Sequence, residues 1–594
     1  MNFEINKDLA PLTTFGIPAR VSLYKEYDSV DMLTKISRTP EFSDNEVLHI
    51  GGGSNLLFVN DFKGLVLHSA IKGVKFYRKD EETVYAIAGA GENWDGFVAR
   101  CVENGFGGIE NLSGIPGEVG ASAVQNIGAY GVEAKDAIHH VECFDTLTRK
   151  TVVFTNGECG FAYRDSRFKH EWKGRYYVIR VSFRLRPSEE ARSLEYSPLA
   201  RLRETLGHSP TIADVRHEVL RIRDSKLPAP AVTGNAGSFF KNPIVSRYYF
   251  EEEILSRHPD VPFYPAGEKR VKLAAGWLIE HAGLKGAESG GAYIYPRQCL
   301  VIANRGDATA ADVTSLADRV IDTVNREFGV RLEPEVNYID STVKVTVLGS
   351  GTSKGVPEIA CGCRVCRSAD SRDKRLRASV MVRTQGMDIL IDASPDLRAQ
   401  ALANDIGKID AILVTHSHYD HVGGFDDLRP FCANGPLPIY VRKDVDTDLR
   451  KRLDYCFRDH LYPGVPAFDM RVIDNSPFFI NGLKIIPIEV VHGKLPIFGY
   501  RIGDFAYITD AKTIAEEELE KLRELDTLII NALRHKEHFA HLNIREAIAL
   551  VEKIKPKRAY FTHFNHEAGL HDELAASLPD DIFPCYDGMT IEIK

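Results

Sequence analysis

Long apolar runs are absent from this sequence of 594 residues. No stretch of about 18 consecutive apolar residues occurs, so we expect no membrane-spanning helix. The opening residues, MNFEINKDLAPLTTFG, lack a basic start followed by an apolar core, which argues against a secretory signal peptide. We therefore expect a cytoplasmic protein with no membrane partner.

Strong net charge and abundant cysteine are also lacking. The 74 basic and 83 acidic residues give a net charge of −9. This mildly acidic balance argues against a nucleic-acid partner. The ten cysteines are unevenly spread, and three of them crowd into the segment CGCRVC at 361–366. Without a secretory leader, this cluster favours metal ligation over disulfides.

The chain is long enough for several hydrophobic cores, because a domain typically takes about 100–200 residues. Glycine-rich loops concentrate in the first 340 residues, whereas eleven of the twenty histidines follow residue 343. One strand-like run ends and another begins around 340–342. The sequence therefore predicts two chemically different halves joined near these residues.

Hydrophobic periodicity predicts mixed α and β structure in both halves. Apolar residues recur at helical spacing over 94–102 and again over 544–551, which indicates amphipathic helices. Short β-branched runs at 411–415 and 484–491 are typical of buried strands. We expect sheets covered by helices.

Two glycine-rich loops in the first half indicate a large phosphate-bearing cofactor. The loop GGGSN at 51–55 follows a strand-like segment, and consecutive glycines let backbone N–H groups converge on an anion. Its spacing is not the Rossmann fingerprint, and alone it could equally be a tight turn. A second stretch, 115–131, makes a dinucleotide cofactor the better interpretation.

Seven motifs in this half follow one another in the order found in the UDP-N-acetylenolpyruvoylglucosamine reductase (MurB) family. They are TTFGIPA, GGGSNLLF, IPGEVGASAVQNIGAYG, YRDSRFK, GNAGSFFKNP, KLAAGWLIE and LEPEV. Residues 1 to about 340 thus resemble that family. The resemblance implies FAD as cofactor, NADPH as co-substrate, and reduction of the nucleotide sugar UDP-N-acetylglucosamine enolpyruvate to UDP-N-acetylmuramate, a peptidoglycan precursor. Another flavoprotein, such as an oxidase, is the rival, and the GNAGSFFKNP loop argues against it.

The resemblance assigns three catalytic roles. Arg164 would stabilise negative charge on the enolate-like intermediate, Ser238 would donate the proton, and Glu335 would act near the substrate carboxylate. Without the motifs, Arg164 would be interpreted as a surface or ion-pair residue, Ser238 as a hydroxyl in a turn and Glu335 as a solvated acid. The resemblance also implies substrate residues, two of which would polarise Ser238 (Lys226 and Asn242) and two of which would contact substrate (Tyr163 and Tyr196). The cofactor residues that it implies are Gly51, Gly52, Gly53, Ser54, Asn55, Gly117, Gly120, Ala121, Ser122, Asn126 and Gly128.

The segment HSHYDH at 416–421 is the strongest local signal in the chain. It follows a strand-like run, so its ligand-type side chains can enter one cavity. The alternative is a solvated histidine cluster that binds no metal. The pattern resembles the metallo-β-lactamase superfamily, which has further ligands downstream in a fixed order. The resemblance implies one divalent metal on His416, His418 and His492, a second on Asp420, His421 and His563, and Asp510 bridging both. Zn and Mn both suit such donors, and a paired-metal site suits phosphodiester hydrolysis.

The cysteine cluster narrows this resemblance. Cys361, Cys363 and Cys366 supply three thiolates, and His566 is the candidate fourth ligand of a structural zinc; three buried structural thiols are the alternative. The combination resembles the PhnP family, phosphoribosyl 1,2-cyclic phosphate phosphodiesterases. That family has a further histidine near the leaving group, for which we favour His541 over His538.

Alternatives for the second half are an RNA-processing nuclease resembling tRNA 3′-processing enzymes, a thioester or lactam hydrolase, and a degenerate domain. The expected fold class is α+β and α/β multidomain. The expected parts are an FAD-binding region of a two-subdomain α+β reductase at 1–205, its substrate domain at 206–340, and a metallo-β-lactamase αββα sandwich at 344–594.

Overall fold

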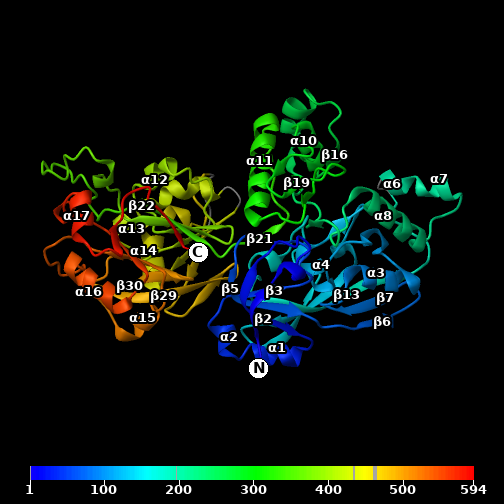
Figure 1. Cartoon of the computed structure of the whole chain (residues 1–594), viewed down its shortest axis with the longest axis horizontal. Coiled ribbons are helices and arrows are strands. Elements are labelled where there is room, and N and C mark those ends of the chain that lie inside the picture. Colours follow the sequence, from blue (N-terminus) through cyan, green and yellow to red (C-terminus); the bar gives the residue numbers. More distant parts are fainter. Residues whose placement is uncertain (1, 195–196, 433–434, 459–463, 594) are drawn as a thin grey trace. The chain divides into compact units, whose positions relative to one another are not determined.

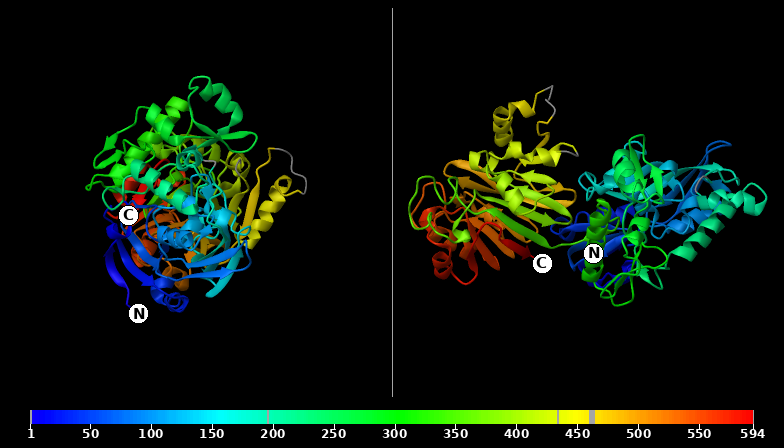
Figure 2. Two further views of the ribbon diagram at one scale, coloured as in Figure 1. Left: turned by 90° about the vertical axis from the view of Figure 1, so that its right-hand side faces the viewer. Right: turned by 90° about the horizontal axis from the view of Figure 1, so that it is seen from above.

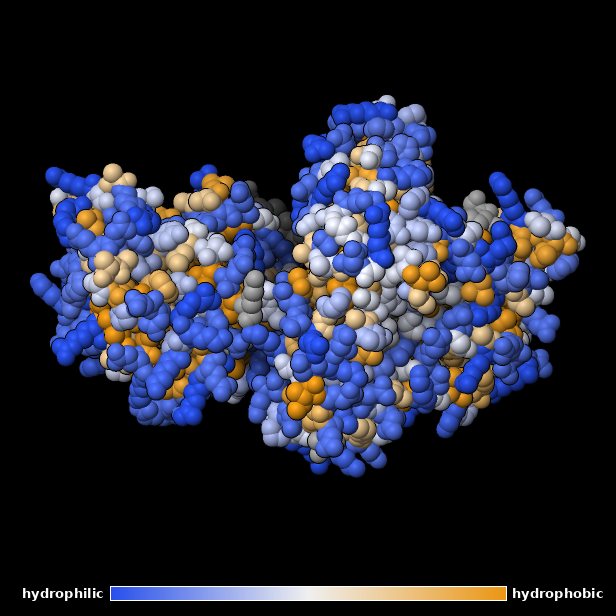
Figure 3. Space-filling model, in the orientation of Figure 1, coloured by the Kyte–Doolittle hydropathy of each residue, from blue (hydrophilic) through white to orange (hydrophobic). Residues whose placement is uncertain are grey.

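The computed structural model describes residues 2–194, 197–432, 435–458 and 464–593 (Figure 1). The chain forms two compact units, Met1–Asp340 and Ser341–Lys594. Within the described residues, no helix is long and apolar enough to cross a membrane. On the face drawn in Figure 3, hydrophilic residues cover most of the surface and apolar residues form small patches.

The first unit begins with a four-stranded sheet that supports the first glycine loop. Its order is β1-β2-β5-β3, and β2, β5 and β3 run parallel. Helix α1 (Val30–Ile36) buries Leu33 and Ile36 against this sheet's core. The loop 51–55 leaves the end of β3. The strands are β1 (Glu4–Asp8), β2 (Arg20–Tyr27), β3 (Val47–Ile50) and β5 (Phe62–Ser69).

A second, antiparallel sheet has the order β12-β11-β13-β7-β6. The predicted helix over 94–102 is α3 (Trp94–Glu103), which buries Trp94, Phe97, Val98 and Cys101 because they share one face. The second glycine loop leads into the short helix α4 (Val119–Gln125). The strands are β6 (Val74–Arg78), β7 (Val84–Gly89), β11 (Ile138–Asp145), β12 (Lys150–Thr155) and β13 (Tyr176–Pro187).

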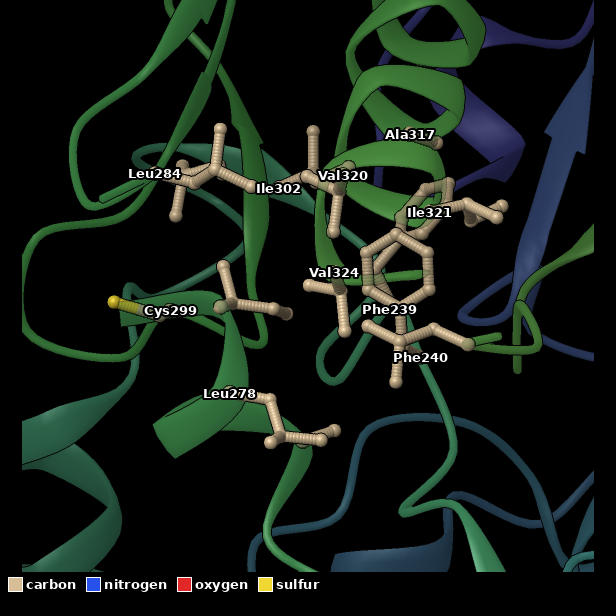
Figure 4. Close-up of a cluster of buried hydrophobic side chains, with 14 of the residues drawn as sticks. Phe239, Phe240, Leu278, Leu284, Cys299, Ile302, Ala317, Val320, Ile321 and Val324 are labelled. Atoms are coloured by element: carbon tan, nitrogen blue, oxygen red, sulfur yellow. The ribbon is translucent and has the colours of Figure 1, made fainter. Parts of the chain in front are cut away.

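The remaining part of this unit has its own core beneath the GNAGSFFKNP loop. Helix α11 (Ala310–Phe328) starts with a capping box at Thr309 and packs beside α10 (Ala275–His281). Phe239 and Phe240 pack against its buried face (Figure 4). The sheets are β14 (Gly234–Asn235), β20 (Ile302–Asn304), β19 (Ala292–Ile294) and β18 (Glu288–Ser289), and β15 (Ile244–Ser246), β17 (Arg270–Leu273) and β16 (Phe263–Pro265).

Two contacts tie the segments of the first unit together. Strand β21 (Asn337–Ile339) pairs in parallel with β4 (Leu56–Phe58), so residues near 335 lie beside the first glycine loop. Helix α8 (Ile212–Lys226) packs against α3, and Arg216 forms a bidentate pair with Asp95 at 2.6 and 2.9 Å. Because α8 packs with the preceding region, we propose that the boundary expected at 205/206 lies after this helix.

The second unit is a sandwich of two sheets with helices outside, as predicted (Figure 2). The sheets have the orders β27-β26-β25-β24-β23-β22-β36 and β28-β29-β30-β31-β33-β34-β35, and side chains from both form one core. The first sheet's strands are β22 (Val343–Gly349), β23 (Ser379–Thr384), β24 (Met387–Ile391), β25 (Ala411–Leu413), β26 (Leu437–Val441), β27 (Phe468–Val472) and β36 (Thr590–Ile593). The second sheet's strands are β28 (Phe478–Ile480), β29 (Leu483–His492), β30 (Leu495–Ile502), β31 (Phe505–Ile508), β33 (Thr527–Asn531), β34 (Arg558–Thr562) and β35 (Ile582–Pro584). The outer helices include α12 (Leu397–Ala403), α14 (Lys443–Arg452), α16 (Ile544–Ile554) and α17 (His571–Ser577).

Candidate active sites

Arg164 and Glu335 meet in the first unit although 171 positions separate them. The distance from Arg164 Nε to Glu335 Oε1 is 2.9 Å, and their side chains are only 18% and 15% exposed. Arg164 has a left-handed backbone (φ 55°), an uncommon conformation for a non-glycine residue, and its guanidinium also donates to the Gly128 carbonyl. A Cβ at Gly128 would lie 2.7 Å from this guanidinium, so the motif glycine gives the arginine its space.

One cavity is lined by eight of the eighteen residues predicted for the first unit, including all three predicted catalytic residues. Gln125 Nε2 donates to Glu335 Oε1 at 3.3 Å, and Asn55 Nδ2 donates to the Glu335 carbonyl at 3.0 Å. Ser238 lines the same cavity and follows Gly237, which has a positive φ of 71°. The predicted residues that line the cavity are Ser54, Asn55, Ala121, Ser122, Gly128, Arg164, Ser238 and Glu335.

Two glycines of the glycine-rich loops lie too close to neighbouring protein atoms to be replaced by a residue with a side chain. A Cβ at Gly53 would lie 1.9 Å from the Leu12 carbonyl oxygen, and its φ is +61°. At Gly117 a Cβ would lie 2.7 Å from Ser54 Oγ, and Ser54 Oγ donates to the Pro116 carbonyl at 3.1 Å. The two loops therefore interlock, with their N–H groups free of Cβ interference.

The predicted substrate residues differ in burial and in their contacts. Tyr163 is half-buried, and burial raises the pKa of its phenol. Asn242 Oδ1 accepts from the Ala275 N–H at 2.9 Å. Lys226 is the last residue of α8, and its side chain is exposed rather than turned into the cavity. Tyr196 lies outside the described residues.

The second unit gathers its predicted metal ligands at the ends of strands. His416 and His418 follow β25, His492 ends β29, Asp510 follows β31 and His563 follows β34. The ligand atoms form two groups, and within each group all the ligand atoms lie within 4.8 Å of one another. These are His416, His418 and His492, and Asp420, His421, Asp510 and His563.

Asp510 lies in the second of these groups, and a carboxylate oxygen of Asp510 also lies within 4.8 Å of ligand atoms of His492 and His541. Its Oδ2 is 3.2 Å from His421 Nε2 and its Oδ1 is 3.2 Å from His563 Nε2. The two histidine nitrogens are buried and make no hydrogen bond within the described residues. Burial holds the pKa of His416 well below its usual value, so this imidazole is neutral and offers a lone pair. These donors fit a pair of divalent cations.

The cysteine cluster and His566 converge as one set of four donors. His566 Nδ1 lies 3.2 Å from Cys361 Sγ, 3.8 Å from Cys363 Sγ and 3.4 Å from Cys366 Sγ. Three sulfurs and one imidazole at this spacing fit a closed tetrahedral zinc site.

His541, and not His538, lies against the ligands. Its Nδ1 is 3.5 Å from Asp510 Oδ1, and its ring centre is 4.6 Å from that of His492. Burial lowers the pKa of His541 to about 3. The imidazole of His538 instead accepts from the Ala540 N–H at 3.3 Å.

Comparison with known proteins gives the first unit its family. Residues 22–158 match the family model for an FAD binding domain, and residues 229–339 match the C-terminal domain of UDP-N-acetylenolpyruvoylglucosamine reductase. A UDP-N-acetylenolpyruvoylglucosamine reductase of Neisseria meningitidis is 48% identical over 337 residues, which are 56% of this chain and 97% of that protein. The chain belongs to the UDP-N-acetylenolpyruvoylglucosamine reductase family.

Other members of the reductase family are also similar to this chain. The reductase of Porphyromonas gingivalis is 45% identical over 343 residues, 57% of this chain and 100% of that protein. A solved structure of the Thermus caldophilus reductase (MurB) is 26% identical, covers 57% of this chain and 99% of its own, and has a TM-score of 0.40.

The second unit carries a different family signature. Residues 388–564 match the beta-lactamase superfamily domain. A solved structure of a new diphosphatase from the PhnP family is 40% identical, covers 43% of this chain and 98% of its own, and has a TM-score of 0.40. The predicted union of a MurB-family reductase with a metallo-β-lactamase-fold domain is confirmed.

Sequence reasoning missed several residues around the reductase cavity. Lys169 Nζ donates to Gln125 Oε1 at 3.0 Å and to the Arg164 carbonyl at 3.1 Å, and burial lowers the pKa of its ammonium. Arg223 and Glu118 also line the cavity. Gln125 and Glu118 lie within the second glycine-rich motif, so the motif itself was the signal that could have identified them.

Asp392 is the residue missed in the hydrolase domain. It is fully buried, and its Oδ2 lies 2.7 Å from His421 Nδ1. Thr415 donates to the same carboxylate from its N–H and its hydroxyl, both at 2.8 Å. Such a carboxylate fixes the ring orientation and tautomer of a ligating histidine. Its position directly after β24 was the available signal.

Proposed function

We propose that residues 1–340 reduce UDP-N-acetylglucosamine enolpyruvate to UDP-N-acetylmuramate, with NADPH as the electron source. FAD, when bound, supplies the hydride that reaches one carbon of the enolpyruvyl double bond. The observation that carries the proposal is the convergence of Arg164, Ser238 and Glu335 on one cavity beside the glycine loops.

These three residues complete the addition across the double bond. Arg164 stabilises the negative charge that spreads from the second alkene carbon to its carboxylate. The Ser238 hydroxyl gives its proton to that carbon, so one hydride and one proton are added. Glu335, paired with Arg164 at 2.9 Å, holds the guanidinium in place and faces the same cavity.

Replacing Ser238 tests this assignment. Ser238→Ala should lower turnover by about 10²–10⁴-fold, the usual contribution of a positioned proton donor, while NADPH still reduces the flavin at nearly the normal rate. Stopped-flow absorbance separates the two half-reactions. Ser256→Ala, an exposed hydroxyl bonded only within its own helical segment, is the matched control. If Ser238→Ala slowed flavin reduction by NADPH as much as substrate reduction, Ser238 would not be the proton donor.

We propose further that residues 344–594 hydrolyse a phosphodiester, with a cyclic phosphate as the expected substrate. Two groups of ligand atoms support this proposal, and Asp510, a member of one group, also lies within 4.8 Å of His492 in the other. Divalent metals, when bound, would activate a water and polarise a phosphoryl oxygen. His416, His418 and His492 would hold one ion, Asp420, His421 and His563 the other, and Asp510 both. His541 would lie near the leaving oxygen.

Asp420→Ala should silence only the hydrolase. Loss of a second-layer partner of a metal commonly costs 10–100-fold, so loss of a ligand should lower phosphodiesterase activity by more than about a hundredfold. Bis(p-nitrophenyl) phosphate is the assay substrate, and Asp469→Ala, an exposed carboxylate on β27, is the control. A parallel fall in reductase activity in Asp420→Ala would contradict the proposal that the reductase and hydrolase sites act independently.

Comparing substrates separates the alternatives. A thioester, a precursor tRNA and a diphosphate compound should each be cleaved more slowly than the phosphodiester. Preferential cleavage of the tRNA or the thioester would replace the proposal with the nuclease or thioesterase function. Preferential cleavage of the diphosphate would instead give this domain the activity for which the 40% identical diphosphatase is named.

A further inference from the structure

Phe539 is a large apolar side chain exposed at the rim of the proposed metal site. Its exposed fraction is 82%, so it adds little to any core. Its ring centre lies 4.8 Å from that of His538, and it precedes His541 by two residues. Single exposed hydrophobic residues are ordinary on protein surfaces, so the place of this one, and not its exposure, calls for an explanation.

The ring lies beside the turn that follows His492. Gly493, which follows the ligand His492, has a φ of +63°, and a Cβ placed there would lie 3.8 Å from Phe539 Cε2. The carbonyl of Ala540 is 3.0 Å from His492 Nδ1, so the segment carrying Phe539 is anchored to a ligand. Because 82% of Phe539 is exposed, most of its ring is left uncovered beside this turn.

The chain segments beside the ring carry mostly basic side chains that are open to solvent. Lys494 follows Gly493 with an exposed side chain, and His535, Lys536 and Glu537 are exposed shortly before Phe539. The ligand His418 is itself exposed, which leaves the metal group accessible to a substrate. An aromatic platform among cations is the arrangement by which proteins bind a heterocyclic base and its phosphate together.

We propose that Phe539 stacks on the base of a nucleoside-containing substrate whose phosphate enters the metal site. This inference rests on the proposed phosphodiester hydrolysis and specifies its substrate class. The phosphate is recognised at the ligand groups and at Lys494, and the base at the uncovered face of Phe539. A phosphodiester with only a sugar attached lacks the second contact.

Binding of two products that differ only in the base tests the proposal. The full-length, metal-loaded protein is titrated calorimetrically with AMP and with ribose 5-phosphate. Wild type should bind AMP about tenfold more tightly, a difference of about 1.4 kcal/mol. Phe539→Ala should reduce this preference to about twofold or less, and Phe539→Trp should restore it. Phe479→Ala, an exposed phenylalanine on β28, should leave it unchanged.

Wild type without a preference for AMP, or an unchanged preference in Phe539→Ala, would overturn the inference. Metal content and thermal unfolding of Phe539→Ala should match wild type because the side chain is exposed, so a folding defect is detected separately. If AMP is preferred but no p-nitrophenyl ester is cleaved, the proposed hydrolysis fails while the base contact stands. If the esters are cleaved but AMP is not preferred, the base contact fails while the proposed hydrolysis stands.

Discussion

The residues that matter most in the first unit are pairs whose members come from distant segments. Arg164 lies in the YRDS motif and Glu335 in the LEPEV motif, yet their side chains form a half-buried ion pair. The sequence motifs identified both residues but not their contact, because their separation of 171 positions conceals it. In the second unit the order of the ligands predicted their convergence, since each follows a strand of the same sandwich.

Some contacts of the sites could not be found from the sequence for physical reasons. Asp392 is one acidic residue among many, and only the fold shows that it contacts His421 at 2.7 Å. Lys169 belongs to the YRDSRFK motif, but its bond to Gln125 depends on the packing of two loops. Buried partners of a site are specified by three-dimensional packing, which spacing along the chain does not reveal.

His68 gives a pH prediction at this scale. Its Nε2 lies 3.1 Å from Glu118 and its Nδ1 3.0 Å from Glu26, and carboxylates only accept, so both nitrogens carry protons. The bond to Glu118, followed by that to Glu26, raises the pKa of His68 above 6.5 despite burial. Its stabilisation is therefore complete below pH 6.5 and is lost as pH rises through the raised pKa.

Because Glu118 packs against Gly51 and Gly52, loss of this proton should loosen the glycine loops and promote flavin release at alkaline pH. Flavin fluorescence measured against pH gives the release curve. His68→Gln should flatten the curve, whereas His217→Gln, an exposed histidine on α8, should leave it unchanged. A wild-type curve that is flat from pH 6 to 9 would contradict the role of His68.

At the scale of elements, loops do the binding and sheets position them. The helix over 94–102, the strands over 411–415 and 484–491 and the αββα sandwich were predicted from periodicity and motif order, and the structure has them with ends shifted by a few residues. The path of the loops was not predicted, because loops are held by contacts such as that between Gly53 and Leu12 rather than by local pattern.

Gly53→Ala tests the loop packing. The added methyl group would overlap the Leu12 carbonyl at 1.9 Å and would have to accept a φ of +61°, so the loop must move by more than a side-chain adjustment. We expect the purified variant to lose most of its flavin. Gly157→Ala, where a Cβ meets nothing within 4 Å, should keep it. Full flavin content in Gly53→Ala, measured by absorbance, would contradict the interlocked loops.

At the scale of the molecule, two compact units each have their own cores and their own candidate site. The first carries glycine loops and no cluster of metal donors within its described residues, and the second carries all the donor clusters found. A reductase of the MurB family and a metallo-β-lactamase-fold domain thus share one chain with separate chemistry.

The flavin and metal content of one purified sample tests this account most directly. Absorbance spectroscopy combined with metal analysis should find about one flavin per chain, from the loops of the first unit, and about three divalent ions, two at the paired site and one at the cysteine cluster. A colourless protein that takes up no added FAD and holds no transition metal would contradict it.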